Sequence, residues 1–321
     1  MAVAGTTNLL THPSRVHAWF RGLSVLSMLS VFALVVLGGI VRVTGSGLGC
    51  PDWPLCHGGF LPPLELKPII EYSHRMAASF LVGPLVVITC GVAWVAYRRE
   101  RWLVIPATIA LLLLLAQALL GGATVANELP GALVAAHLAL GEALVACLVL
   151  ISVVAYRGPI SIRSPNRATG QPDRFPLLAV GSAAAVYLLL ISGSYVSVSG
   201  ATGACLDWPL CQGDILPEHR LQMIHMAHRF AAVFLGLFVL YTLHLGLRQR
   251  GRPANVRMLS IAVAAALVAQ VMVGAATVWL DFAVELRALH QATATAVWGG
   301  MAGLAALSFT GPALSQRGAS P

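Results

Sequence analysis

Residues 50–56 read Cys-Pro-Asp-Trp-Pro-Leu-Cys, and residues 205–211 read Cys-Leu-Asp-Trp-Pro-Leu-Cys. The two stretches begin 155 positions apart, and each is followed by a His-Arg pair, at 74–75 and at 228–229, that opens a long apolar run. An internal repeat of this kind indicates a duplicated structural unit and is read before any single element. The chain is therefore predicted to consist of two related halves.

The repeat continues through the later part of each half, where four residues recur at a constant shift of 153 positions. These are Gln117, Gly121, Thr124 and His137 in the first half, and Gln270, Gly274, Thr277 and His290 in the second. The duplication thus keeps a histidine at four places, all in apolar surroundings. It predicts a scaffold that holds two pairs of histidine ligands.

Composition places this scaffold in a membrane. The chain is 58% hydrophobic and 10% charged, with a mean hydropathy of +0.81, whereas a soluble domain carries roughly 25% charged residues. A run of about 20 apolar residues is long enough to cross a bilayer as a helix, and an open sheet is excluded there because its backbone groups would stay unpaired. Eight such runs lie near 22–41, 76–97, 103–125, 132–156, 176–197, 226–247, 258–279 and 288–310.

The predicted fold is all-α and polytopic, with eight transmembrane helices in two tandem pseudo-symmetric four-helix bundles. The bundles are expected over 1–160 and 161–321, with a polar linker at 157–174. Fourteen of the 20 Lys and Arg residues fall in the N-terminal segment, the even-numbered loops and the tail. The positive-inside rule then places both termini in the cytoplasm of a multi-pass plasma-membrane protein. No basic stripe with aromatic residues accompanies the net charge of +8, which argues against nucleic-acid binding.

The histidines His74, His137, His228 and His290 lie near the predicted outer ends of the even-numbered helices. Ionisable groups inside a membrane are costly and usually functional. Neutral imidazole binds zinc, copper and iron alike, but two histidines from two helices, repeated in a second bundle, favour haem iron held between helices. Arg75 and Arg229 each follow a candidate ligand; pairing with a haem propionate and snorkelling to the interface are equally good interpretations.

Four cysteines lie in the predicted outer loops, where the oxidising environment allows disulfides. Their spacing favours structural bridges Cys50–Cys56 and Cys205–Cys211, with zinc binding by the two pairs as a weaker alternative. Cys90 and Cys147 fall in apolar helices and are expected to act as small hydrophobic residues.

The halves differ three residues before the first histidine of each, where Glu71 stands in one and His225 in the other. A spacing of three puts Glu71 and His74 on one helix face. A carboxylate at a haem edge serves as a general base, so Glu71 is the candidate catalytic residue. The alternative is an acid at a helix N-terminus, stabilised by the helix dipole.

Taken together, Glu71-Tyr72-Ser73-His74-Arg75, the Cys50–Cys56 pair and the three later histidines resemble the haem A synthases of aa3-type cytochrome oxidase assembly. The resemblance covers residues 20–310 and implies oxidation of the C8 methyl of haem O to a formyl group. It implies that His228 and His290, with Arg229, bind a resident haem b, its iron held by both imidazoles. It implies that His74, His137 and Arg75 surround the substrate haem O, with Glu71 needed for turnover. Both cysteine pairs together resemble the bacterial type.

Two other functions stay open at this point. A bis-His di-haem electron carrier would need no Glu71 and would have symmetrical halves. A transporter would show helices broken by Gly or Pro at mid-membrane, and these apolar runs are largely unbroken. The electron acceptor, a homo-oligomeric state and direct transfer of haem O from haem O synthase are not determined by the sequence.

Overall fold

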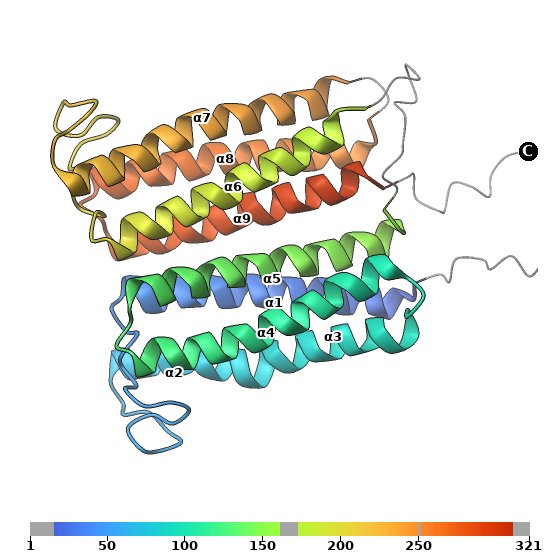
Figure 1. Ribbon diagram of the computed structural model, residues 1–321, viewed down its shortest axis with the longest axis horizontal. Helices are drawn as coiled ribbons and strands as arrows, with labels where there is room; N and C mark the ends of the chain where they lie inside the picture. The colour runs from blue at the N-terminus through green and yellow to red at the C-terminus, as the bar shows by residue number, and fades with distance from the viewer. Residues whose placement is uncertain (1–15, 161–172, 250–251, 311–321) are drawn as a thin grey trace, which may run out of the picture.

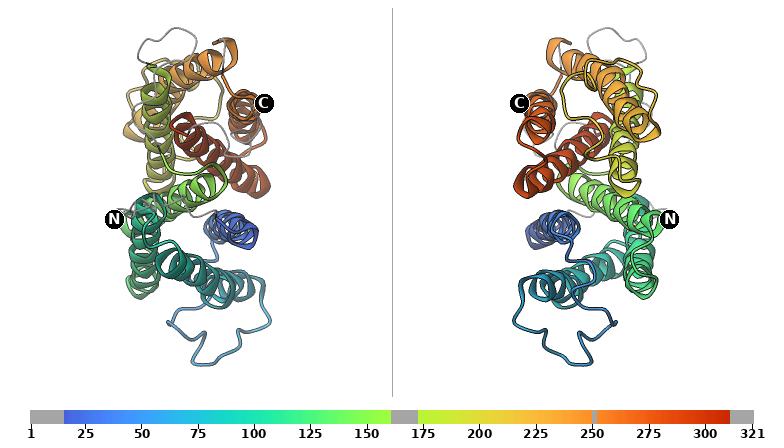
Figure 2. Two further views of the ribbon diagram at one scale, coloured as in Figure 1. Left: turned by 90° about the vertical axis from the view of Figure 1, so that its right-hand side faces the viewer. Right: turned by 90° about the vertical axis from the view of Figure 1, so that its left-hand side faces the viewer.

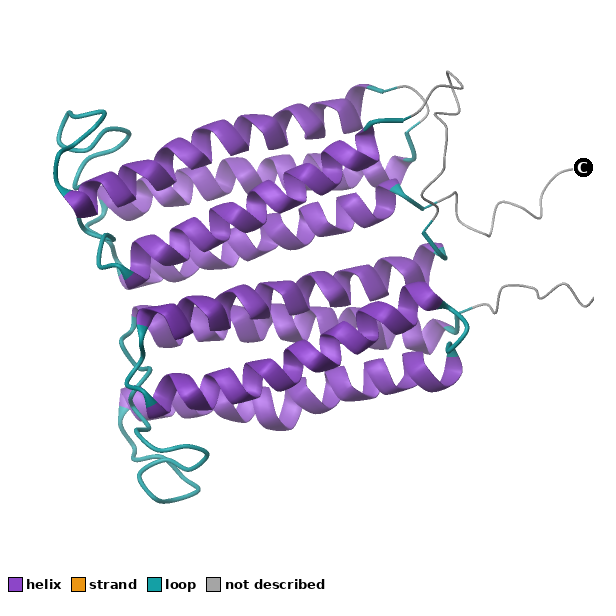
Figure 3. Cartoon of the chain, in the orientation of Figure 1, coloured by secondary structure: helices purple, strands orange, loops and turns teal. Residues whose placement is uncertain are grey.

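The computed structural model describes residues 16–160, 173–249 and 252–310. Within these ranges the chain is helical and contains no strand (Figure 3). The first half contains α1 (Ala18–Val43), α2 (Leu66–Met76), the π-helix η1 (Ala77–Val82), α3 (Gly83–Ala96), α4 (Arg101–Ala126) and α5 (Gly131–Arg157). The second contains α6 (Phe175–Val198), α7 (Arg220–Arg248), α8 (Ala254–Trp279) and α9 (Val284–Ser308). The predicted linker falls mostly outside the described residues.

Seven of these helices are long and apolar enough to cross a membrane, counting α2, η1 and α3 as one 31-residue helix, Leu66–Ala96. The helix α9 matches them in length but carries Gln291, Thr293 and Thr295, which lower its hydropathy. Large apolar side chains such as Leu112, Leu119 and Phe234 point outward and are more than half exposed, as expected where lipid replaces water. The prediction of an all-helical membrane protein is confirmed at this level.

The helices lie in two groups (Figure 1). They are here called the N-terminal half, α1 to α5, and the C-terminal half, α6 to α9. The halves meet where α5 contacts α6 and α9, and where α1 contacts α9; the end views in Figure 2 show α1 and α5 facing the second half. The loops 44–65 and 199–219 lie at one end of the molecule, the cysteine-loop end. The described chain starts and stops at the other.

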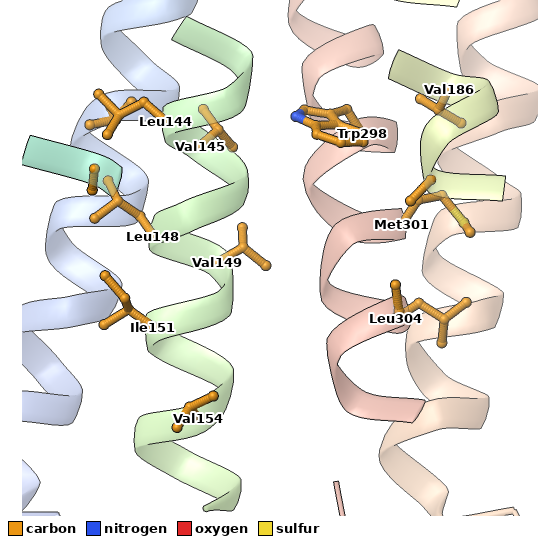
Figure 4. Packing of buried hydrophobic residues seen from close by; sticks show 14 of the residues in the cluster. Leu144, Val145, Leu148, Val149, Ile151, Val154, Val186, Trp298, Met301 and Leu304 are labelled. Atoms are coloured by element: carbon orange, nitrogen blue, oxygen red, sulfur yellow. The ribbon is translucent and has the colours of Figure 1, made fainter. Parts of the chain in front are cut away.

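The apolar core extends through both halves and across the contact between them (Figure 4). Leu148 of α5 and Met301 of α9 are fully buried but point into their own halves. Across the contact between the halves, Val149 of α5 packs against Gly303 of α9. Because interiors pack at the density of organic crystals, this contact holds the helices that carry two of the candidate histidines in a fixed relation.

Two helices begin earlier than their apolar runs predicted, at Leu66 and Arg220 in place of about 76 and 226. Glu71 therefore lies in the middle of α2, and no acidic residue occupies the first turn. The interpretation of Glu71 as an acid at a helix N-terminus is wrong. The amphipathic first turns form helix because they pack against the cysteine loops, a tertiary contact that hydropathy does not register.

The π-helix η1 begins at Ala77, two residues after Arg75. Pro84 has no backbone N–H to donate, and the N–H of Gly83 reaches five residues back, to the carbonyl of Ala78. Such π-segments frequently occur at functional sites. Here the segment joins the amphipathic α2 to the apolar α3 without a break.

Candidate functional site

Each of the four candidate histidines packs its ring against a glycine of a neighbouring helix. A Cβ built on these glycines would lie 3.1 Å (Gly38–His74), 3.4 Å (Gly121–His137), 3.2 Å (Gly193–His228) and 3.0 Å (Gly274–His290) from the imidazole Cε1 atom. Gly38 and Gly193 are equivalent in the repeat, as are Gly121 and Gly274. Glycine is thus used at all four places where a helix backbone approaches a ring closely.

The structure places the histidines near one another as the two predicted pairs. His74 of α2 lies near His137 of α5, and His228 of α7 lies near His290 of α9. In the part of the chain that the structure describes, no three His, Cys, Asp or Glu side chains gather as a metal-binding group. Two imidazoles suit a haem, whose porphyrin supplies the other donors, better than a tetrahedral zinc ion.

The two pairs differ in the hydrogen bonds of their rings. Nδ1 of His228 lies 2.7 Å from Oγ of Ser192, whereas Nδ1 of His74 and of His137 is buried without a partner among the described residues. With Nδ1 protonated, Ser192 accepts its hydrogen bond and Nε2 keeps a lone pair for iron. The repeat puts Leu37 where the second half has Ser192. In the C-terminal pair, therefore, a hydrogen bond orients the ring of a candidate ligand, His228, before any haem binds.

Arg75 and Arg229 bind the cysteine loops. Arg75 donates to the carbonyls of Cys50, Asp52 and Leu55 at 2.6–2.8 Å. Arg229 makes the same kind of contacts with Asp207, Pro209 and Leu210. Neither sequence interpretation, a propionate partner or snorkelling, anticipated this role. The contact of each arginine with a haem remains a prediction.

Glu71 joins the helix of His74 to the first cysteine loop. Its side chain is buried, Oε2 accepts a hydrogen bond from the N–H of Cys50 at 2.8 Å, and Oε1 pairs with Arg75 at 2.5 Å. At the equivalent place His225 is buried, and its Nδ1 has no partner among the described residues. The asymmetry expected from the sequence is therefore an ion pair in one half and a neutral ring in the other.

Both predicted cysteine pairs lie at disulfide distance, with Sγ atoms 1.97 Å apart in Cys50–Cys56 and 2.08 Å apart in Cys205–Cys211. Asp52, inside the first pair, accepts hydrogen bonds from the N–H groups of Gly58 and His57. These bonds, with Gly58 first, hold the pKa of Asp52 below its usual value. The loop is thus closed covalently and tightened by a carboxylate.

We expect mass mapping without reductant to recover both links, Cys50–Cys56 and Cys205–Cys211, from protein isolated in non-reducing buffer. Cys90 and Cys147, which lie in helices as free thiols, provide the internal control because alkylation of the unfolded chain should label them alone. Labelling of all six cysteines would contradict both the pairing and the placement of these loops in an oxidising compartment.

A cleft of about 380 Å³ separates the first cysteine loop from α4. Gly122, one of its lining residues, directly follows Gly121, which contacts the ring of His137. Ala126 lines one side, and the repeat puts Trp279 at the equivalent position of the second half. The Trp279 ring packs edge-on against Trp208, with centroids 5.4 Å apart. The second half thus has an indole ring at the position where the first half has an alanine and an open cleft.

Two further polar residues were not singled out by the sequence. Glu142 of α5 is fully buried at the contact between the halves and accepts a hydrogen bond from Thr295 at 2.6 Å; these residues are 153 positions apart, the shift of the repeat itself. Arg42 of α1 donates to Gln291 of α9 at 2.8 Å. An alignment of the two halves could have found Glu142, because the equivalent residue of the second half, Thr295, is neutral. In the sequence, Arg42 contributes only to the count of basic residues that predicts the membrane orientation.

The chain matches the family COX15-CtaA, described as cytochrome oxidase assembly protein, over residues 21–302. It is similar to the proteins named "Heme A synthase" of Bacillus cereus (strain 03BB102) and of Bacillus mycoides (strain KBAB4). Each is 28% identical over 276 residues, which cover 85% of this chain and 88% of the relative.

Proposed function

Because this chain belongs to the COX15-CtaA family of cytochrome oxidase assembly proteins, we propose that it is a haem A synthase. The substrate is haem O, and the reaction oxidises its C8 methyl group to the formyl group of haem A. The observation that carries the proposal is the pair of two-histidine sites, each built from two helices and lined by glycine, in a chain whose relatives bear that enzyme's name.

The two sites are proposed to hold different porphyrins. His228 and His290 hold the resident haem b, and His74 and His137 receive haem O. Three asymmetries support this division: Ser192 orients His228, Trp279 packs on Trp208, and an open cleft lies between the first cysteine loop and α4. A resident cofactor needs a fixed, closed site, whereas a substrate needs a way in and out.

The residues of the first half have separate roles in the proposed reaction. His74 and His137 hold the haem O iron and so fix the position of the C8 methyl. Removal of electrons builds positive character on that carbon, and Glu71 stabilises it and accepts the proton. Water then adds, and a second oxidation yields the aldehyde. The two oxidations remove four electrons in total, and a resident haem b would pass them, one at a time, to an electron acceptor outside the protein.

The same proposal extends to architecture and topology. The halves, 1–160 and 161–321, form two tandem four-helix bundles related by pseudo-symmetry, with α2, η1 and α3 as one span. The repeat shift of 153 to 155 positions and the hydrogen bond between Glu142 and Thr295 support this relation. The arginine count supports a plasma-membrane protein with cytoplasmic termini and the cysteine-loop end outside.

The function is tested by the haem content of the purified protein, produced in cells that also make haem O. We expect haem b together with haem A or hydroxylated haem O, identified by extraction and mass. A protein that holds only haem b and leaves haem O unchanged in the same cells would be a bis-His electron carrier, and the proposal would fail.

A further inference from the structure

Arg42, at the cysteine-loop end of α1, reaches from the N-terminal half into the C-terminal half. Its Nη2 donates to Oε1 of Gln291 at 2.8 Å. Its Nε and Nη1 are buried and have no hydrogen-bond partner among the described residues. The charged group of α9 that acts on Arg42 is Arg287, a second cation. Burying a charge without a counter-ion costs on the order of several kcal/mol, so this site is built for an anion.

The position of Arg42 relates it to both histidine pairs. Gly38, which contacts the ring of His74, lies four residues earlier on α1, about 6 Å along the helix axis. Gln291 directly follows His290. The guanidinium therefore lies at the contact between the halves, between a helix that contacts His74 and a helix that carries His290.

The surrounding backbone is shaped to hold this arrangement. A Cβ on Gly39 would lie 3.0 Å from Cδ and Oε1 of Gln291, so glycine makes the space in which the amide meets Arg42. The repeat has Ser197 at the position of Arg42 and Leu138 at that of Gln291. The pairing of Arg42 with Gln291 therefore has no repeat-related copy in the second half.

Of the other arginines near the histidines, Arg75 donates through both Nη atoms to loop carbonyls. Arg229 donates to loop carbonyls through Nη1 alone, and its Nη2 is buried without a partner among the described residues. A cation in the last turn of a helix can also serve the helix dipole, but the Arg42 guanidinium is turned towards Gln291 of another helix. Gln291 takes one of the two N–H groups of Nη2. The other N–H of Nη2 lies on the same edge of the guanidinium as Nε–H or Nη1–H, and that edge can bind a carboxylate in a fork geometry.

We propose that Arg42, held in place by Gln291, is the binding site for a porphyrin propionate carboxylate at the contact between the halves. The inference rests on the proposed function, because that function supplies the porphyrins. The carboxylate belongs either to haem O bound at His74 and His137 or to the resident haem b at His228 and His290, and the experiment separates these sources.

The test uses the purified full chain in detergent with its resident haem, titrated with haem O and with haem O dimethyl ester. The wild-type protein should bind the free acid more tightly than the ester. In Arg42→Gln this preference should shrink by about tenfold, the effect of one lost charge-assisted hydrogen bond. Arg42→Lys, which keeps the charge without the fork, should fall between them. If the resident haem is the source, the preference stays and its reduction potential falls in Arg42→Gln.

Arg257→Gln is the matched control, since Arg257 is exposed at the opposite end of the molecule; it should change neither quantity. Should Arg42→Gln fail to fold, Arg42→Lys and Gln291→Leu carry the same comparison. An unchanged preference together with an unchanged potential overturns the proposal. Both readouts are independent of turnover. If the protein makes no haem A but its preference for the free acid depends on Arg42, the proposed enzyme activity is refuted and the carboxylate site at Arg42 is supported.

Discussion

Glu71→Gln is expected to abolish haem A formation while leaving the resident haem b in place. The amide keeps the size of the carboxyl and still accepts the hydrogen bond from Cys50, but it removes the negative charge that pairs with Arg75. Loss of a general base lowers a rate by roughly 10²–10⁴-fold. Haem b should persist because its proposed ligands lie in the other half. Extracted haems, separated by mass, should show haem O accumulating.

The equivalent substitution in the second half, His225→Gln, is the matched control and should leave haem A output near normal. Because Glu71 also holds the cysteine loop, titration with haem O separates its two roles. Binding of haem O at wild-type affinity without turnover assigns the loss to the missing charge. Loss of binding assigns it to the loop. Normal haem A output at normal protein level would refute a catalytic role for Glu71.

His228→Ala and His290→Ala should each remove the low-spin b-type signal from the reduced-minus-oxidised spectrum. A bis-His haem loses its low-spin state when either axial imidazole is removed. Haem A formation should stop as well, because no haem b would remain to carry away the electrons removed from haem O.

Three sets of further variants serve as comparisons for that result. His74→Ala and His137→Ala should keep the b-type signal and lose haem O binding. His244→Ala, an exposed position on α7, should change neither. Ser192→Ala should keep the haem but shift its reduction potential, because the other ring nitrogen of His228 would lose its partner. An unchanged low-spin signal in both His228→Ala and His290→Ala would contradict the ligand assignment.

The sequence by itself determined the helices, the duplication and the candidate ligands. Hydropathy determines a membrane span because the bilayer acts on each segment separately, and a shift of 155 or 153 residues pairs equivalent positions without any knowledge of packing. Four histidines, two cysteine pairs and the difference between Glu71 and His225 follow from these local signals. The same signals placed the starts of α2 and α7 too late, because their first turns are stabilised by contacts with the loops.

Only the tertiary structure decided what these residues touch. Arg42 and Gln291 are 249 positions apart, and their contact depends on how α1 and α9 are rotated about their axes, which hydropathy does not specify. The packing of each histidine on a glycine, and the loop contacts of Arg75, depend on the same rotations and on distances of a few ångströms. Side-chain contacts between helices arise from the shapes of both surfaces together, so no pattern within one segment contains them.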